Sequence, residues 1–428
     1  MSMKRFGLML IILVVVASFS MAGGKAEGQE GSDTEPIRIG ASLALTGNLG
    51  SAGKSILLAW QICLEDWNAK GGVLGRPVEL VYYDDHSNAS EVPGLYTKLI
   101  TVDKVDFIQS PYGTPAITAA MPIAMEHGMV YPGNAALAAN KEFNYKYYFS
   151  FWPLGPRQVE GIADLFFEAA MSSGEKNLTV AILSEDNEYG ARVSEGALES
   201  VKKYGLKVVY NDRYPPSPAT VDFTPVVRAV QNTGADLFFV GSFPQGTISI
   251  IKACKEVGYK PKLFGGAMTG VAYAANLTEL GPLLNGVCAC CYYVPEPTIQ
   301  FGNVEDFLET YQSRAAVEGV DPLGYYNPPW AYSSMDTLLK AIEATGSLDQ
   351  TVVGDYILAN GWDSVVGKGA WDPAGSGEIA ESRGFLVQWR GIESNDLSEF
   401  MVPGKQVIIA PEEYQSGPML WPSPLFED

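Results

Sequence analysis

The chain has 428 residues, 47% of them hydrophobic, and a formal net charge of −20. This length is enough for two or three domains with a sizeable core. A strongly acidic chain is repelled by nucleic acid and by an anionic membrane surface, so the charge argues against both as partners and fits a soluble monomer.

The first 22 residues have the features of a secretory signal peptide. Residues 1–5 include two basic residues, residues 6–16 form an apolar run, and Ser20 and Ala22 are the small residues that a signal peptidase reads. Residues 23–36 are polar and predict a disordered spacer. The sequence therefore predicts an exported protein, periplasmic or otherwise extracytoplasmic. Nothing after residue 22 is apolar for long enough to span a bilayer.

From residue 37 strand-like and helix-like segments alternate, which is the pattern of an α/β sheet protein. In a first series, we expect strands at 37–45, 77–85, 105–110 and 129–134, and helices at 54–72, at 89–103 and from Thr114 onward.

A second series begins near residue 155. Its strands are expected at 178–186, 206–214, 235–242, 261–268 and 384–390, and its helices at 157–174, 188–205, 223–234, 246–258, 304–319 and 328–346. The simplest architecture is two doubly wound α/β lobes with parallel sheets. A ligand would bind in the cleft between them, beyond the C-terminal strand ends.

Several strand ends carry residues suited to line such a cleft. Thr114 is predicted to cap a helix that starts with Pro115, and the free N–H groups of that first turn favour an anion such as a carboxylate. The alternative is that Thr114 only caps its own helix. Tyr189 and Phe243 stand at two equivalent strand ends and face a loop of small residues around Met268 and Thr269.

The chain shows no motif for catalysis or for metal or cofactor binding, so no enzyme activity, metal or cofactor is predicted. Cys288, Cys290 and Cys291 read as small buried strand residues, the first two on one strand face and the third on the other. Asp84 and Asp85 are expected to cap the helix that follows them.

An exported hydrolase remains an alternative function. Its nucleophile would be Thr114 or a cysteine, and its base would be His86 or His127.

The chain resembles the periplasmic leucine/isoleucine/valine-binding proteins, the solute-binding components of ABC importers for branched-chain amino acids. The resemblance starts at residues 37–85, including "NAKGGVLGRPVEL", and covers essentially the whole chain after the signal. It continues through "DNEYG", "FVGSFPQG", "AYSSMDTLLKAIEATGS" and "GFLVQW".

This resemblance implies a type I periplasmic binding fold, with two α/β lobes joined by three crossovers near residues 155, 296 and 383. Lobe 1 would comprise residues 37–155 and 297–382, and lobe 2 residues 156–296 and 383–428. The ligand-binding residues carried over from the family are Thr114, Ala116, Asn134, Ala135, Ala136, Tyr189 and Phe243, with Met268 and Thr269 at the strand end nearest the ligand's amino group.

The implied function is capture of an amino acid, or a related small carboxylate or amide, and its delivery to an ABC transporter permease. The alternative within binding is a ligand sensor that docks on a membrane receptor. The family commonly has an acidic residue near Met268 and Thr269 that pairs with the ligand ammonium, and this sequence does not. Either Asp186 or Glu188 supplies that charge, or the ligand lacks an ammonium group.

Overall fold

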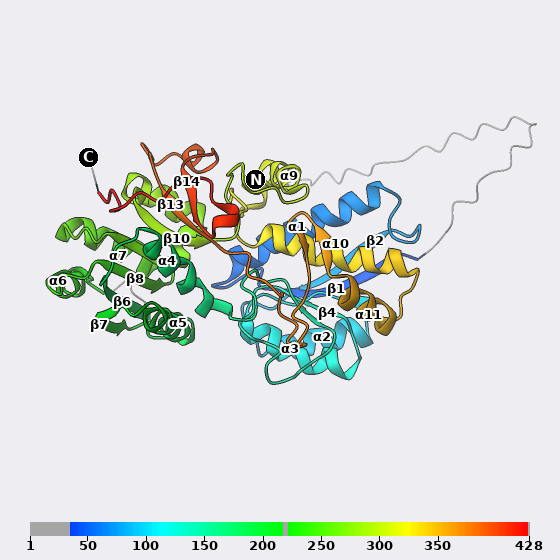
Figure 1. The fold of residues 1–428 in the computed structure, drawn as a ribbon. Helices are drawn as coiled ribbons and strands as arrows, with labels where there is room; N and C mark the ends of the chain where they lie inside the picture. Colours follow the sequence, from blue (N-terminus) through cyan, green and yellow to red (C-terminus); the bar gives the residue numbers. More distant parts are fainter. Residues whose placement is uncertain (1–34, 217–220, 427–428) are drawn as a thin grey trace, which may run out of the picture. The chain divides into compact units, whose positions relative to one another are not determined.

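The computed structural model describes residues 35–216 and 221–426 (Figure 1). The predicted signal peptide and all but the last two residues of the predicted spacer lie outside this range. From Pro36 on, the described residues belong to one compact unit.

The first sheet is parallel and has three strands in the order β2-β1-β3. Its central strand places Ile37, Ile39, Ala41 and Leu43 on one face, whereas the other face has the small residues Gly40 and Ser42, and helices cover both faces. On one face α1 and α10 pack in a shared hydrophobic core, and on the other α2 and α3 do so. The elements are β1 (Ile37–Leu43), α1 (Gly50–Ala69), β2 (Val78–Asp84), α2 (Val92–Thr101), β3 (Phe107–Ile108), α3 (Thr114–Glu126) and α10 (Pro328–Thr345).

The second sheet has seven strands in the order β14-β13-β10-β9-β8-β6-β7. The run from β7 to β10 is parallel, whereas β13 pairs antiparallel with both β10 and β14. The strands are β6 (Thr179–Glu185), β7 (Lys207–Tyr214), β8 (Leu237–Ser242), β9 (Leu263–Met268), β10 (Val287–Cys291), β13 (Phe385–Trp389) and β14 (Gln406–Ala410).

Helices also cover both faces of the second sheet. Phe239 points to the face covered by α4 (Gly161–Ser172) and α5 (Glu188–Tyr204), and Phe238 points to the face covered by α6 (Thr224–Asn232) and α7 (Pro244–Val257). Figure 1 shows these four helices around β6, β7 and β8. The α/β class predicted from the sequence is confirmed. The sequence predicts parallel sheets, and the second sheet departs from this at β13 and β14, which are antiparallel additions.

The remaining elements are short or connect the two sheets. The helix α9 (Val304–Glu318) packs on α1, and α11 (Gln350–Asn360) packs on α10. The others are β4 (Tyr131–Gly133), which pairs with β5 (Tyr148–Ser150), then η1 (Gln158–Glu160), η3 (Thr269–Ala272), α8 (Ala274–Leu280), η4 (Gly281–Leu284), β11 (Trp362–Ser364), β12 (Gly367–Gly369), η5 (Leu397–Phe400) and η6 (Glu412–Tyr414).

The prediction that Asp84 and Asp85 cap the next helix is wrong. The Asp84 carboxylate accepts hydrogen bonds from the backbone N–H groups of Leu45 and Thr46, at 2.9 and 3.3 Å. Asp85 accepts one from the Ser42 hydroxyl at 3.2 Å. The two carboxylates therefore hold the end of β1 and the loop that follows it. Hydrogen bonds to an ionised carboxylate are roughly twice as strong as those between neutral groups.

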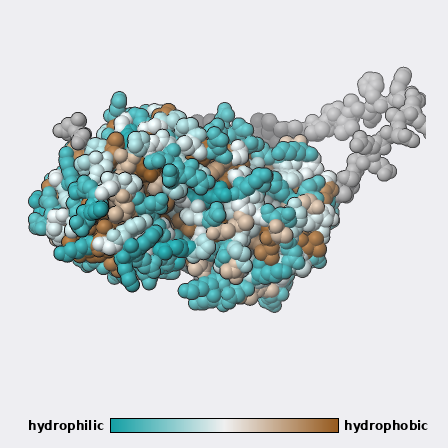
Figure 2. Space-filling model, in the orientation of Figure 1, coloured by the Kyte–Doolittle hydropathy of each residue, from teal (hydrophilic) through white to brown (hydrophobic). Residues whose placement is uncertain are grey.

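One face of the molecule is mainly polar. Hydrophilic residues cover most of the face in Figure 2, and hydrophobic residues lie on it in scattered groups. In the part of the chain that the structure describes, no helix combines the length and apolar character needed to cross a membrane.

Candidate functional site

A cavity of about 280 Å³ lies where elements of both sheets end. From the first sheet's side it is lined by Thr114, at the start of α3. From the second sheet's side it is lined by Tyr189 after β6, by Phe243 after β8 and by Met268 at the end of β9. The C-terminal ends of parallel strands are where α/β proteins bind ligands, so this cavity is the candidate site.

Six of the nine predicted binding residues line this cavity: Thr114, Ala135, Tyr189, Phe243, Met268 and Thr269. The other three do not. Ala116 and Ala136 are packed in the core beside α3. The Asn134 side chain is buried and bonded to Ser110, and its oxygen accepts from the Ser334 hydroxyl at 3.4 Å.

The hydroxyl of Thr114 does not cap α3, contrary to the prediction. Gly113 is the N-cap residue of α3, and Thr114 is already in the helix. Its oxygen accepts a hydrogen bond from the backbone N–H of Leu137 at 2.8 Å. A hydroxyl that accepts in this way still carries a proton, so Thr114 remains a donor at the cavity wall.

Tyr189 and Phe243 form a stacked pair of rings on one side of the cavity. Their centroids lie 5.2 Å apart with an interplanar angle of 24°. The Tyr189 hydroxyl donates to the carbonyl of Ala267 at 3.0 Å, which ties the start of α5 to the end of β9. Phe243 remains 40% exposed. An exposed apolar ring of this kind is available for further burial.

A second aromatic group, made of Trp152, Tyr292 and Tyr326, lies in the cavity wall and was not predicted from the sequence. Trp152 packs against Tyr292 at 5.3 Å and edge-on against Tyr326 at 5.4 Å between ring centroids. All three line the cavity. Trp152 and Tyr292 each come directly or almost directly after a strand, β5 and β10, and that position was the signal that could have found them.

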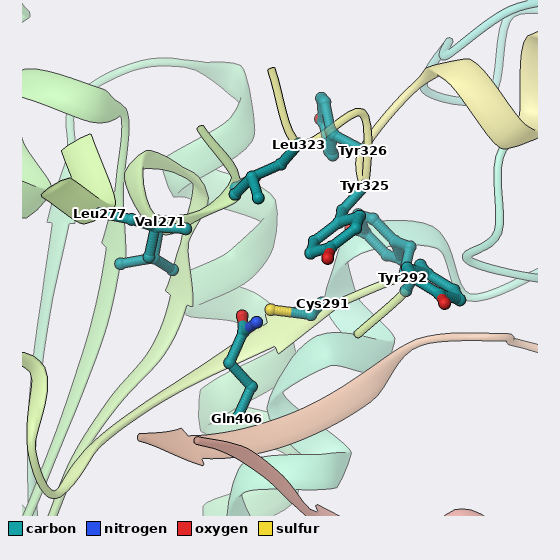
Figure 3. Close-up of a pocket in the computed structure, with 10 residues that line it drawn as sticks. Val271, Leu277, Cys291, Tyr292, Leu323, Tyr325, Tyr326 and Gln406 are labelled. Carbon is teal, nitrogen blue, oxygen red and sulfur yellow. The ribbon is translucent and has the colours of Figure 1, made fainter. Parts of the chain in front are cut away.

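Behind this aromatic group lies a smaller cavity of about 20 Å³ (Figure 3). Ala272, Tyr292 and Tyr326 line both cavities, so the two tyrosine rings form part of the partition between them. In Figure 3 the sulfur of Cys291 and the amide of Gln406 point toward each other across the smaller space.

The wall of the larger cavity is uncharged. Among the described residues that line it there is no Asp, Glu, Lys, Arg or His. Burial raises the pKa of the Cys290 thiol to about 12 and raises the pKa of Tyr292 and of Tyr326 well above the usual value. These groups are therefore neutral at pH 7.

The two acids considered from the sequence lie outside this cavity. Asp186 is exposed and pairs with Arg213 at 3.6 Å. Glu188 lines a neighbouring polar hollow of about 510 Å³, which shares Thr114 and Leu137 with the cavity. The carboxylate of Glu188 therefore lies beside the cavity and does not line it.

The cavity also lacks the pair of groups that a hydrolase would need. His127 ends α3, and His86 forms a hydrogen bond with Glu91 at 3.1 Å in the loop after β2. Neither histidine lines the cavity.

The five cysteines are free, and Cys288 and Cys291 point into different cores, as predicted for opposite faces of one strand.

Comparison with known proteins identifies the family. A family model described as periplasmic binding protein matches residues 36–395. Leu/Ile/Val-binding protein homolog 8 of Brucella abortus is 24% identical over 285 residues, which is 65% of this chain and 70% of that protein. Homolog 7 of the same organism is 24% identical over 332 residues, 76% of this chain and 81% of that protein.

Solved structures show the same fold. A leucine-binding protein of Thermotoga maritima is similar with a TM-score of 0.66 at 20% identity, over 83% of this chain and 96% of that chain. A solute-binding protein of an ABC transporter from R. palustris, in complex with 4-hydroxybenzoate, gives 0.65 at 22% identity, over 84% and 94%. The resemblance noted from the sequence is thus confirmed, and the chain belongs to the periplasmic binding protein family.

Proposed function

We propose that this protein is the extracytoplasmic solute-binding component of an ABC importer. It captures an amino acid or a related small carboxylate or amide in the cavity and delivers it to a membrane permease. The observation that carries the proposal is the cavity itself, which is aromatic and uncharged and lies at the strand ends of both sheets in a member of this family.

Relatives support the transport role. The similar proteins of Brucella abortus are named as Leu/Ile/Val-binding homologs, and the similar structures include a leucine-binding protein and an ABC-transporter solute-binding protein. The protein then acts as a binder and not as an enzyme. The N-terminal signal would place it outside the cytoplasm, and it would act as a monomer.

We further propose lobe boundaries at residues 155, 296 and 383. Strands β1 to β3 and helices α9 to α11 would then form lobe 1, whereas β6 to β10, β13 and β14 would form lobe 2. Trp152 and Tyr292, which lie a few residues before the proposed crossovers at 155 and 296, would line the cleft at its hinge side. Closure of the lobes would then bury the ligand and the exposed ring of Phe243.

A thermal-shift screen of the purified protein tests the proposal. Because a ligand that binds only the folded state stabilises it, a cognate solute at 100 times its dissociation constant should add about 2.7 kcal/mol of stability. The panel would hold amino acids, aliphatic and aromatic carboxylates, and amides. Failure of every small solute to raise the midpoint would contradict the proposal.

A further inference from the structure

The charge and shape of the cavity wall narrow the class of solute. This inference rests on the proposed function, since it concerns the ligand of that same site. We infer that the ligand is an aromatic carboxylate or amide without an ammonium group.

The described wall of the cavity has no negative charge that could pair with a ligand ammonium. A buried ammonium needs a carboxylate or several well-placed acceptors, because an unpaired charge is costly to remove from water. Among the described residues lining the cavity there is no carboxylate. The nearest acid considered, Glu188, lines only the neighbouring hollow. An amino-acid ligand seated in the cavity would find no carboxylate for its ammonium, only ring faces and neutral oxygens.

The cavity wall carries a side-chain donor suited to an acceptor oxygen. The Thr114 hydroxyl accepts from the backbone N–H of Leu137, so its own proton is available to another acceptor. This donor matches a ligand that brings acceptor oxygens, as a carboxylate or an amide does. The indole N–H of Trp152 has no hydrogen-bond partner within the described chain, but it is fully buried and could reach a ligand only if the indole ring moved.

The cavity has aromatic walls and a volume that suit a ligand with one ring. Tyr189 and Phe243 form one flat stacked surface, and Trp152 with its two tyrosine neighbours forms a second aromatic surface in the same cavity. A cavity of about 150 Å³ is enough to hold benzene. The volume here, about 280 Å³, leaves room for one ring and a short side chain. Rings contact other rings favourably in stacked and edge-on geometries, beyond the area they bury.

Four ligands measured by calorimetry test the inference. They form two pairs that differ only in the ammonium group: 3-phenylpropanoate with phenylalanine, and 4-methylpentanoate with leucine. We expect 3-phenylpropanoate to bind at least about tenfold more tightly than phenylalanine, because only the amino acid carries the unpaired cation. We also expect it to bind at least about tenfold more tightly than 4-methylpentanoate, because the rings of the wall favour a ring.

Each other outcome overturns part or all of the inference. If phenylalanine or leucine binds as tightly as its partner without the ammonium, the ligand carries that group after all. If 4-methylpentanoate binds as tightly as 3-phenylpropanoate, the requirement for a ring is wrong. If none of the four binds but a solute of the wider panel that is neither an aromatic carboxylate nor an aromatic amide does, the inferred class falls and the proposed function stands. If no small solute binds, both fall.

Discussion

The hydroxyl oxygen of Thr114 lies 2.8 Å from the backbone nitrogen of Leu137 and accepts its hydrogen bond. Thr114 begins α3, and Leu137 belongs to the segment after β4, so this one contact joins two parts of the cavity wall. It gives Thr114 a structural role as well as a proposed ligand contact.

Replacement of Thr114 tests both roles. Thr114→Val keeps the volume but leaves the Leu137 N–H without its acceptor, which should lower the free energy of unfolding by about 1–3 kcal/mol. It should also weaken binding of a carboxylate, since the donor to the ligand is gone. Thr114→Ser keeps the hydroxyl and is the control. Urea unfolding and calorimetry measure the two effects. Wild-type affinity in the valine variant would confine Thr114 to its structural role.

Phe243 should matter for binding far more than for folding. It is 40% exposed without ligand, so Phe243→Leu should change the free energy of unfolding by less than about 1 kcal/mol. The variant should lose affinity for an aromatic carboxylate by several-fold, because the stacked surface with Tyr189 is lost.

Tyr82, on β2, offers a matched control for this substitution. It is also 40% exposed and does not line the cavity, so Tyr82→Leu should leave ligand affinity unchanged. Equal losses of affinity in the two variants would mean that the effect at Phe243 is not local to the site.

Glu378 should make stability fall with rising pH. Burial raises the pKa of its carboxyl from 4.5 to about 7; the nearby Ser150, Gln158 and Arg192 offset this only in part, and Asp372 adds to it. Its two oxygens have no hydrogen-bond partner among the described residues. Because the folded state then holds the proton more tightly than the unfolded state, stability is lost as the pH rises from 4.5 through 7.

The variant Glu378→Gln isolates this effect. Above pH 7 the ionised, buried Glu378 should lower the free energy of unfolding by about 3 kcal/mol. The glutamine variant cannot ionise and should not lose this stability. We therefore expect the stability difference between wild type and variant to be smallest at pH 4.5 and to favour the variant increasingly up to pH 8. Unfolding curves across this range provide the measurement. A difference independent of pH would show that Glu378 has an ordinary pKa in the folded state.

The cysteines should be unreactive in the folded protein. All five are free, four are buried, and the fifth, Cys290, lines the cavity with its pKa raised to about 12 by burial. Since the thiolate is the reactive form, a thiol reagent at pH 8 should label none of them rapidly. All five should react after denaturation without reductant. Fewer than five would reveal a disulfide.

The sequence predicted the site best where one strand leads directly into one helix. Tyr189 and Phe243 could be placed at the cavity because aromatic residues after parallel strands meet at one sheet edge. The actual partner of Thr114 could not be foreseen, since Leu137 is 23 residues away and the contact depends on the path of the intervening chain. Local rules for helix starts therefore gave Thr114 the wrong cap role.

The rest of the site depends on packing between distant segments. Tyr326 reaches the cavity from the connection between α9 and α10 and meets Trp152 there, which no local pattern indicates. The antiparallel addition of β13 and β14 to a parallel sheet could not be predicted either, because β13 pairs with β10, about 100 residues earlier in the chain.

Because Tyr292 and Tyr326 stand between the two cavities, the residues behind them could affect which solutes fit the proposed site. Residues such as Cys291, Leu323 and Gln406 border only the small cavity behind those rings. A larger side chain there would press the rings forward, and a smaller one would let them retreat. The dimensions of the proposed binding cavity would thus depend partly on side chains that do not line it, and substitutions at those positions could change its size.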